Sequence, residues 1–372
     1  MMKALNSSLQ RWLKTGLLVC LLVALSSGWG SSSAIAEVLI SRLPQGNAIT
    51  DGRALLRYAL PIDNPPVRKL QATLEDIATP LRSRKRLTSI NSSLTQAERI
   101  LTNQQDALLA SVPPDQRVDA GFLIAEMLMG INEMRSNIED EDKEALWTNR
   151  ARLLEKVGRL EELMVPEFPY EVPEEYANLP QLKGRATVAV KTNKGDLTII
   201  VDGYSAPVTA GNFVDLVKRG FYNGLPFTRA EDSYVLQIGD PPGEAIGFID
   251  PKTKQYRAIP LEVLVKGDKV PTYGITLEDA GRFLEQPVLP FSAYGAVAMA
   301  HSADNANDAS SQFFFFLFEP ELTPAGANLL DGRYAVFGYV VEGKDVLGKL
   351  KAGDKIEFAE VISGLENLVE PA

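Results

Sequence analysis

The chain has 372 residues, enough for two or three domains with substantial apolar cores. Its 48 acidic and 38 basic residues give a formal net charge of −10, so nucleic acid and anionic lipid headgroups are poor partners. It holds a single histidine and a single cysteine, which excludes a triad or a metal site built on several histidines. We therefore expect neither a metal nor a cofactor.

The first 36 residues are predicted to be a secretory signal. Three basic residues precede an apolar run at 16–25, and Ala34-Ile35-Ala36 has the small-x-small form of a cleavage site. Cleavage after Ala36 would also remove Cys20, so the mature protein would have no thiol. An uncleaved membrane anchor is the alternative, although the apolar run is short for a transmembrane helix.

Residues 37–164 are predicted to form a helical bundle. A short helix is expected at 53–60. Asn64 before two prolines marks the start of the next helix, Pro80 should kink or end it, and Asp115 is placed to cap a third. Apolar residues recur at helical spacing in four stripes, namely Val67, Leu70, Leu74, Ile77 and Leu81; Leu87, Ile90, Leu94, Ala97 and Leu101; Val118, Phe122, Ala125 and Met129; and Leu146, Leu153, Val157, Leu160 and Met164.

These stripes favour an antiparallel bundle with its own core. The alternative is that one helix pairs with a partner protein and regulates it. No heptad pattern continues for more than about three turns, and this favours the self-contained bundle.

Residues 165–183 are predicted to be an acidic, proline-rich linker. Prolines alternate with glutamates, and no lysine or arginine intervenes between 161 and 181. The segment can be a solvated spacer or a strap that docks a basic partner, and its composition favours the spacer. Beyond Lys183 the apolar period changes to two. The stretches 186–190 and 197–201 then predict a hairpin with its turn at 193–196, and a helix should open at 206–213.

Four motifs follow in order along the rest of the chain. They are Phe227-x-Arg229, Tyr234-x-x-Gln237-x-Gly239-Asp240, Ser311-Gln312-Phe313-Phe314, and Leu330-Asp331-Gly332 followed by Val336-Phe337-Gly338. Together they resemble the cyclophilin family of peptidyl-prolyl isomerases over residues 184–365. The resemblance implies that 184–372 form a cyclophilin-like domain, a closed antiparallel β-barrel with capping helices.

The resemblance also implies a reaction. Rotation about an X-Pro bond faces a barrier of ~20 kcal/mol, and a cationic donor aimed at the prolyl nitrogen stabilises the twisted state. Arg229 would be that donor, Gln237 would anchor substrate backbone, and an apolar slot would hold the proline ring. The substrate-binding residues implied by the resemblance are Tyr234, Val235, Gln237, Ala300, His301, Gln312, Phe314, Leu329, Leu330 and Tyr334.

Four departures from the family pattern leave a second hypothesis open. Tyr234, Leu329 and Tyr334 stand where phenylalanine, tryptophan and often histidine are expected, and an insert at about 241–292 replaces a glycine-rich loop. The alternative is a binding chaperone with little or no catalysis, autoinhibited by its helical domain.

The insert, the bundle, the acidic linker and the end at 364–368 resemble one branch of the family, the forty-kilodalton thylakoid lumen cyclophilins of plants and their cyanobacterial relatives. This closer resemblance implies export to the thylakoid lumen or periplasm. It implies a role in assembling and maintaining photosystem II, with proline-containing lumenal loops of its chlorophyll-binding subunits as partners. It also implies that the helical domain packs on the barrel and that membrane association occurs only through partners.

Overall fold

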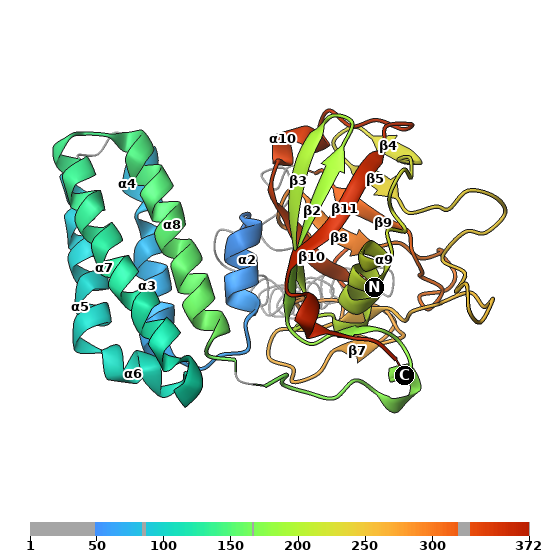
Figure 1. Ribbon diagram of the computed structural model, residues 1–372, viewed down its shortest axis with the longest axis horizontal. Helices are drawn as coiled ribbons and strands as arrows, with labels where there is room; N and C mark the ends of the chain where they lie inside the picture. Colours follow the sequence, from blue (N-terminus) through green and yellow to red (C-terminus); the bar gives the residue numbers. More distant parts are fainter. Residues whose placement is uncertain (1–48, 84–86, 166, 319–327, 372) are drawn as a thin grey trace, which may run out of the picture.

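The structure is a computed structural model that describes residues 49–83, 87–165, 167–318 and 328–371. A helical half and a sheet half lie side by side (Figure 1). The predicted signal at 1–36 lies outside the described residues. Within these described segments no helix has both the length and the apolar character needed to cross a membrane.

The helical half begins as predicted. The Asn64 side chain accepts a hydrogen bond from the Val67 N–H at 3.0 Å, and Pro65 is the first helical residue. The first helix ends at Asp76, whose carbonyl would meet the ring of Pro80 if the helix continued. The helices are α3 (Pro65–Asp76), α4 (Ala78–Arg82), α5 (Asn91–Asn103), α6 (Gln105–Ala110), α7 (Arg117–Glu139) and α8 (Lys143–Glu162), with short 3-10 turns at Leu87–Ile90 and Pro114–Gln116.

The first, second and fourth predicted stripes pack into the core of this half, with Leu87 only partly buried. The prediction for the third stripe is wrong. α7 buries its opposite side, including Leu123, Met127 and Ile131, whereas Val118, Phe122 and Met129 are 66%, 66% and 72% exposed. α7 carries apolar residues on two sides, and spacing alone does not decide which side packs on α5 and α8. Asp115 does not cap α7 either, because it lies in the preceding 3-10 turn.

The sheet half holds one eight-stranded antiparallel sheet in the order β11-β2-β3-β10-β8-β9-β5-β4. The predicted hairpin is confirmed as β2 and β3, with Thr192 opposite Gly195. The strands of this sheet are β2 (Arg185–Thr192), β3 (Gly195–Asp202), β4 (Arg229–Glu231), β5 (Val235–Ile238), β8 (Ala296–Met299), β9 (Phe313–Phe316), β10 (Val336–Glu342) and β11 (Ile356–Ser363). Two small pairs join β1 (Gln181–Leu182) to β12 (Leu368–Val369) and β6 (Glu262–Val263) to β7 (Thr272–Tyr273).

The sheet curls so that its two edge strands approach each other. The Phe227 N–H, just before β4, donates to the Asp354 carbonyl at 2.7 Å, and Pro226 forms an isolated bridge with Lys355, just before β11. In the part of the chain that the structure describes, no ladder joins β4 to β11. The domain is therefore a curled antiparallel sheet, and full closure into a barrel stays a prediction.

Helix α9 (Pro207–Lys218) is buried against the inner core of the curled sheet, and the insert holds its first turn. Glu262 of β6 accepts hydrogen bonds from the N–H groups of Val208 and Thr209 at 3.3 and 2.9 Å. The residue before the helix is Ala206, whose side chain cannot accept a bond, so Glu262 acts as the cap from a distant part of the chain. Burial raises the pKa of Glu262 to about 7.

The linker is not a free spacer along its whole length. Val172, Tyr176 and Leu179 pack against the core of the sheet half, and the linker ends in β1, which pairs with β12. The prolines and glutamates of the linker favour a solvated segment. Burial of these three apolar side chains removes apolar surface from water and so holds part of the linker against the sheet half.

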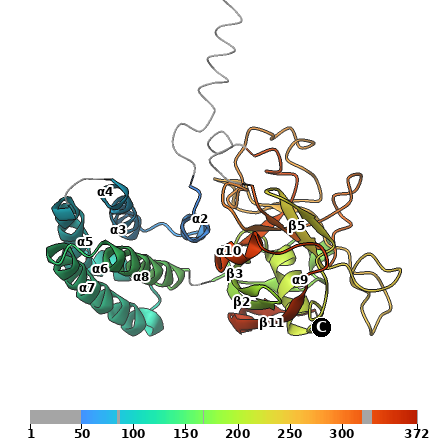
Figure 2. The same ribbon diagram turned by 90° about the horizontal axis from the view of Figure 1, so that it is seen from above.

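A short helix, α2 (Gly52–Ala59), lies between the two halves (Figure 2). Its Leu55, Leu56 and Ala59 join an apolar cluster with Tyr339 of β10. Arg185 of β2 connects all three parts. It donates to Asp202 at 2.7 Å, to Glu162 of α8 at 3.0 Å and to the Leu56 carbonyl of α2. A cleft of about 710 Å³ lies between α2, α8 and the sheet.

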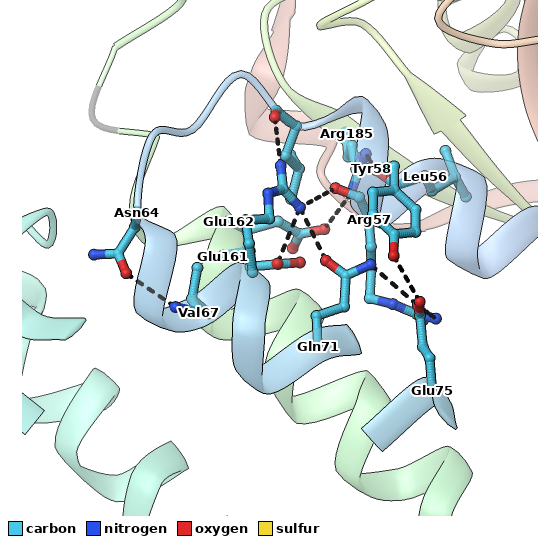
Figure 3. A network of polar contacts seen from close by, with 12 residues as sticks. Leu56, Arg57, Tyr58, Asn64, Val67, Gln71, Glu75, Glu161, Glu162 and Arg185 are labelled. Carbon is cyan, nitrogen blue, oxygen red and sulfur yellow. Dashed lines mark hydrogen bonds and ion pairs between the residues drawn. The ribbon is translucent and has the colours of Figure 1, made fainter. Parts of the chain in front are cut away.

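A polar network fixes the chain where α2 leads into α3 (Figure 3). Arg68 donates to the carbonyls of Arg57 and Leu60, each at 2.9 Å, and to the buried Glu161 carboxylate at 3.0 Å. Burial raises the pKa of Glu161 to about 7, although Arg68 opposes this shift. The Arg57 side chain continues the network to Glu75 at 2.9 Å.

Two glycine-to-alanine changes are expected to have opposite effects on stability. A Cβ on Gly52 would lie 2.7 Å from the Tyr339 Cβ, whereas a Cβ on Gly121 of α7 would meet nothing within 4 Å. The change at Gly121, inside α7, gains up to about 1 kcal/mol in helix propensity, whereas overpacking at Gly52, the first residue of α2, costs about 1–3 kcal/mol. Thermal unfolding should therefore show a lower Tm for Gly52→Ala and a higher Tm for Gly121→Ala. A higher Tm for both would show that α2 does not pack this tightly on β10.

Candidate active site

One row of cross-strand partners places the main candidate residues on the outer face of the sheet. Residues that are directly opposite on neighbouring strands point to the same face. Arg229 is opposite Gln237, and Gln237 is opposite Phe314. The row continues through Ala298 to Val336. The register of β4, β5 and β9 thus brings the predicted donor, the predicted backbone anchor and the predicted floor of the proline slot together.

A second row, two residues along the strands, places an acidic side chain beside the donor. Glu231 is opposite Val235, and Val235 is opposite Phe316. The Glu231 carboxylate accepts from Arg229 Nε at 2.7 Å and lies 2.6 Å from its Nη2. The two side chains are 52% and 48% exposed, so this ion pair contributes little to stability. A substrate bound by Arg229 must either displace Glu231 or use the third guanidinium nitrogen, Nη1.

Phe314 is held between two aromatic rings and is only 5% exposed. Phe291, from the end of the insert, stacks on it with ring centres 6.0 Å apart, and Tyr334 meets it edge-on at 5.4 Å. Ala300 and Leu330 pack against the same apolar cluster, which includes Val235. This cluster supplies the apolar part of the candidate slot.

The polar part of the candidate site is a pair of amides. Gln237 Nε2 donates to Gln312 Oε1 at 2.8 Å, and the Ala300 N–H donates to the Gln312 carbonyl at 2.9 Å. Gln312 Nε2 in turn donates to the Ile246 carbonyl at 2.8 Å, so the first part of the insert is tied to the site. Each amide has both a donor and an acceptor, which is what extended peptide backbone requires.

Two predicted residues are exposed. Leu329 is 88% exposed, whereas Tyr234 is 38% exposed and meets the rim of the cluster, with its ring edge-on to Phe316 at 6.1 Å. The other nine predicted residues lie on the outer face or on the loops that flank it.

Two residues missed by the sequence reasoning shape this site, Phe291 and Asp331. Asp331 accepts from the Phe291 N–H at 2.8 Å and thereby ties the insert to the loop that carries Tyr334. Burial raises the pKa of Asp331 to about 6. Asp331 stands in a motif that the sequence does show, but the motif does not indicate its partner. Phe291 belongs to an insert that has no counterpart in the family pattern.

His301 bridges two loops that flank the slot. Its Nδ1 lies 2.7 Å from the Ser302 carbonyl oxygen, its Nε2 lies 2.8 Å from the Arg333 carbonyl oxygen, and its ring stacks on Tyr334 at 4.6 Å. Each contact is a hydrogen bond when the ring nitrogen concerned carries a proton, because a carbonyl oxygen only accepts.

Among the described residues, no group of three or more histidine, cysteine, aspartate or glutamate side chains is arranged to hold a metal ion. The chemistry argued for this site needs none, since the reaction only rotates an amide bond.

Comparison with known proteins defines the class. Residues 51–165 match a family model described as the PsbQ-like domain of CYP38-like peptidyl-prolyl cis-trans isomerases, and residues 187–366 match the cyclophilin-type peptidyl-prolyl cis-trans isomerase model. A protein of Synechocystis named as a thylakoid lumen peptidyl-prolyl cis-trans isomerase is 55% identical over 97% of this chain and 96% of its own length. The chain therefore belongs to the cyclophilin-type peptidyl-prolyl cis-trans isomerase family.

Chloroplastic CYP38 of Arabidopsis thaliana is another member of this family, 46% identical over 90% of this chain and 78% of its own length. Among solved structures, a cyclophilin of Cryptosporidium parvum determined in the presence of the dipeptide Ala-Pro covers 48% of this chain and 99% of its own. The TM-score is 0.35 and the sequence identity 21%.

Proposed function

We propose that this protein is a peptidyl-prolyl cis-trans isomerase that works in the thylakoid lumen. The proposal is carried by the row in which Arg229, Gln237 and Phe314 are successive cross-strand partners. The proline ring would rest on the cluster around Phe314, and Gln237 and Gln312 would hold the flanking backbone. The Arg229 guanidinium would leave Glu231 and donate to the prolyl nitrogen as its lone pair localises in the twisted state. The lumenal location rests on the Synechocystis and Arabidopsis relatives.

The test is an isomerisation assay with a proline tetrapeptide. Without a catalyst the conversion takes tens to hundreds of seconds at 25 °C, so catalysis appears as a faster exponential that scales with protein concentration. An unchanged rate at a protein concentration equal to that of the peptide would reject the enzymatic proposal.

A second candidate function is peptide binding without catalysis. Two observations favour it. The Arg229 guanidinium is already paired with Glu231, and Phe314 is only 5% exposed. If this is correct, the tetrapeptide will perturb the NMR signals of Gln237 and Tyr334. Its cis and trans forms will nevertheless interconvert no faster than in buffer.

The form of this alternative in which the helical domain blocks the site has less support. In the described residues, the helical half meets the sheet at Arg185 of β2. α2 packs on Tyr339 of β10 and belongs to the same apolar cluster as Phe314, so it touches the apolar side of the slot and not Arg229. Arg229 lies on β4, at the far edge of the sheet (Figure 1). Contact between the helical domain and Arg229 would need a different arrangement of the two halves.

We further propose that the substrates are lumenal loops of the chlorophyll-binding subunits of photosystem II and that the protein helps to assemble and maintain that complex. The thylakoid and chloroplast locations in the relatives' names and the PsbQ-like model that matches 51–165 support this idea. Peptides with the sequences of those loops should compete with the tetrapeptide, whereas the same peptides with proline replaced by alanine should not. Equal competition by both sets would remove this part of the proposal.

A further inference from the structure

The outer side of α7 carries an apolar line that the fold does not use. Val118, Phe122, Ala125 and Met129, called here the α7 stripe, follow one another at spacings of four, three and four residues. The large side chains are 66%, 66% and 72% exposed for Val118, Phe122 and Met129. Single exposed apolar residues are common, but three large ones along one helix face form a continuous patch of the kind that marks interaction sites.

The shape of this surface suits a helix. Spacings of three and four residues are those of a seam along which a second helix packs. Gly121 lies beside the stripe, and its Cα faces open space, so a partner backbone can approach closely there. α7 belongs to the part of the bundle farther from the sheet half, with α8 and α2 in between (Figures 1 and 2). The stripe is thus separate from the candidate active site.

Acidic side chains border one side of the stripe, whereas Arg117 is exposed beside its N-terminal end. Asp119 and Glu133 of α7 are exposed, and among the described residues neither forms an ion pair. Glu126 on the same side is paired with Lys156 of α8. An anionic lipid surface or an acidic partner would be repelled by this border.

The same charges disfavour a second copy of this chain. An antiparallel two-fold pairing centred on the stripe would place Glu133 of one copy near Asp115 and Asp119 of the other, so like charges would meet.

We propose that the α7 stripe is a docking site for a short amphipathic helix of a partner protein, with lysine or arginine residues beside its apolar face. The partner's apolar residues pack on Phe122 and Met129, and its basic residues pair with Asp119 and Glu133. This inference goes beyond the isomerase function and does not depend on it.

The test uses two labelled helical peptides with the same leucine positions, one bordered by lysines and the other by glutamates, and measures their binding to the whole protein by fluorescence anisotropy. The lysine peptide should bind at least tenfold more tightly. Replacing both Phe122 and Met129 with serine should weaken its binding at least tenfold. The matched control, Phe283→Ser with Leu284→Ser, changes two exposed apolar residues of the insert and should leave binding unchanged.

Charge reversal gives a second test, in which the preferred peptide changes while the apolar residues Phe122 and Met129 stay in place. Asp119→Lys with Glu133→Lys should transfer the preference to the glutamate peptide. Equal binding of both peptides to the wild type, or lysine-peptide binding that survives the loss of Phe122 and Met129, would overturn the proposal. Phe122-dependent dimers in sedimentation would assign the stripe to a second copy, and Phe122-dependent binding to phosphatidylglycerol vesicles would assign it to lipid. Either result would also overturn it.

Discussion

Replacing Arg229 with alanine is expected to lower kcat/KM for proline isomerisation by about 10²–10³-fold, the usual effect of removing one donor aimed at developing charge. The loss should fall mainly on kcat, because the prolyl nitrogen becomes a strong acceptor only in the twisted state. The Arg229 side chain is 52% exposed and its ion pair with Glu231 is at the surface, so the Tm should change little. The measurement is the tetrapeptide assay combined with a thermal melt.

Two further variants test whether the loss of activity is specific to Arg229. Arg53→Ala removes another partly exposed arginine that pairs with a glutamate, Glu342, on a different part of the sheet, and it should leave kcat/KM unchanged. Glu231→Gln should raise kcat/KM by at most about fivefold, because an exposed ion pair holds Arg229 with no more than about 1 kcal/mol. If Arg229→Ala and Arg53→Ala have equal activity, the residue has no catalytic role and the binding function is favoured.

The free energy of unfolding is expected to fall as the pH rises from about 5 to about 8. Burial raises the folded-state pKa of Glu161 and Glu262 to about 7, above their ordinary value of 4.5. Between the two values the folded protein binds more protons than the unfolded chain. The stabilisation is therefore complete below about pH 4.5 and is lost as the pH rises through about 7. The difference between a pKa of 4.5 and one of about 7 corresponds to at most about 3 kcal/mol for each carboxyl group. Asp331, raised to about 6, acts in the same direction.

Thermal melts at pH 5, 6, 7 and 8 measure this dependence, and the Tm should fall by several degrees over the series. Glu161→Gln and Glu262→Gln should each flatten the curve, because an amide does not titrate. Glu360→Gln, an exposed site on β11, should keep the wild-type slope. Acids whose pKa is lowered, such as Asp250 and Asp354, titrate below this window and do not contribute. A Tm that rises with pH would show that these carboxyl groups are ionised at little cost in the folded protein.

The sequence predicted helix starts and turns correctly where these features depend on residues that are close together in the chain. Asn64 before two prolines caps α3 as expected, because the cap and its N–H partner are only three residues apart. The turn at 193–196 joins β2 to β3, and the helix expected from 206 is α9. The motifs around Arg229, Gln237 and Phe314 fall on three neighbouring strands, since the spacing within each motif follows the period of a strand.

The choice between two apolar faces of α7 could not be made from the sequence. Both faces repeat at helical spacing, and only packing against α5 and α8 buries Leu123 and Met127 while leaving Phe122 in water. The same limit applies to the insert. Glu262 accepts hydrogen bonds from the first turn of α9, more than fifty residues away, and Phe291 stacks on Phe314. No short-range sequence pattern predicts either contact.

The sequence by itself therefore determined the helical and sheet halves, the family and the strand positions of the site, because these depend on periodicity and on motifs within a few residues. Only the tertiary structure decided which carboxyl groups are buried, that Arg229 faces Glu231, and which side of α7 stays exposed. Burial and ion pairing depend on distances between residues far apart in the chain, and those distances exist only once the chain has folded.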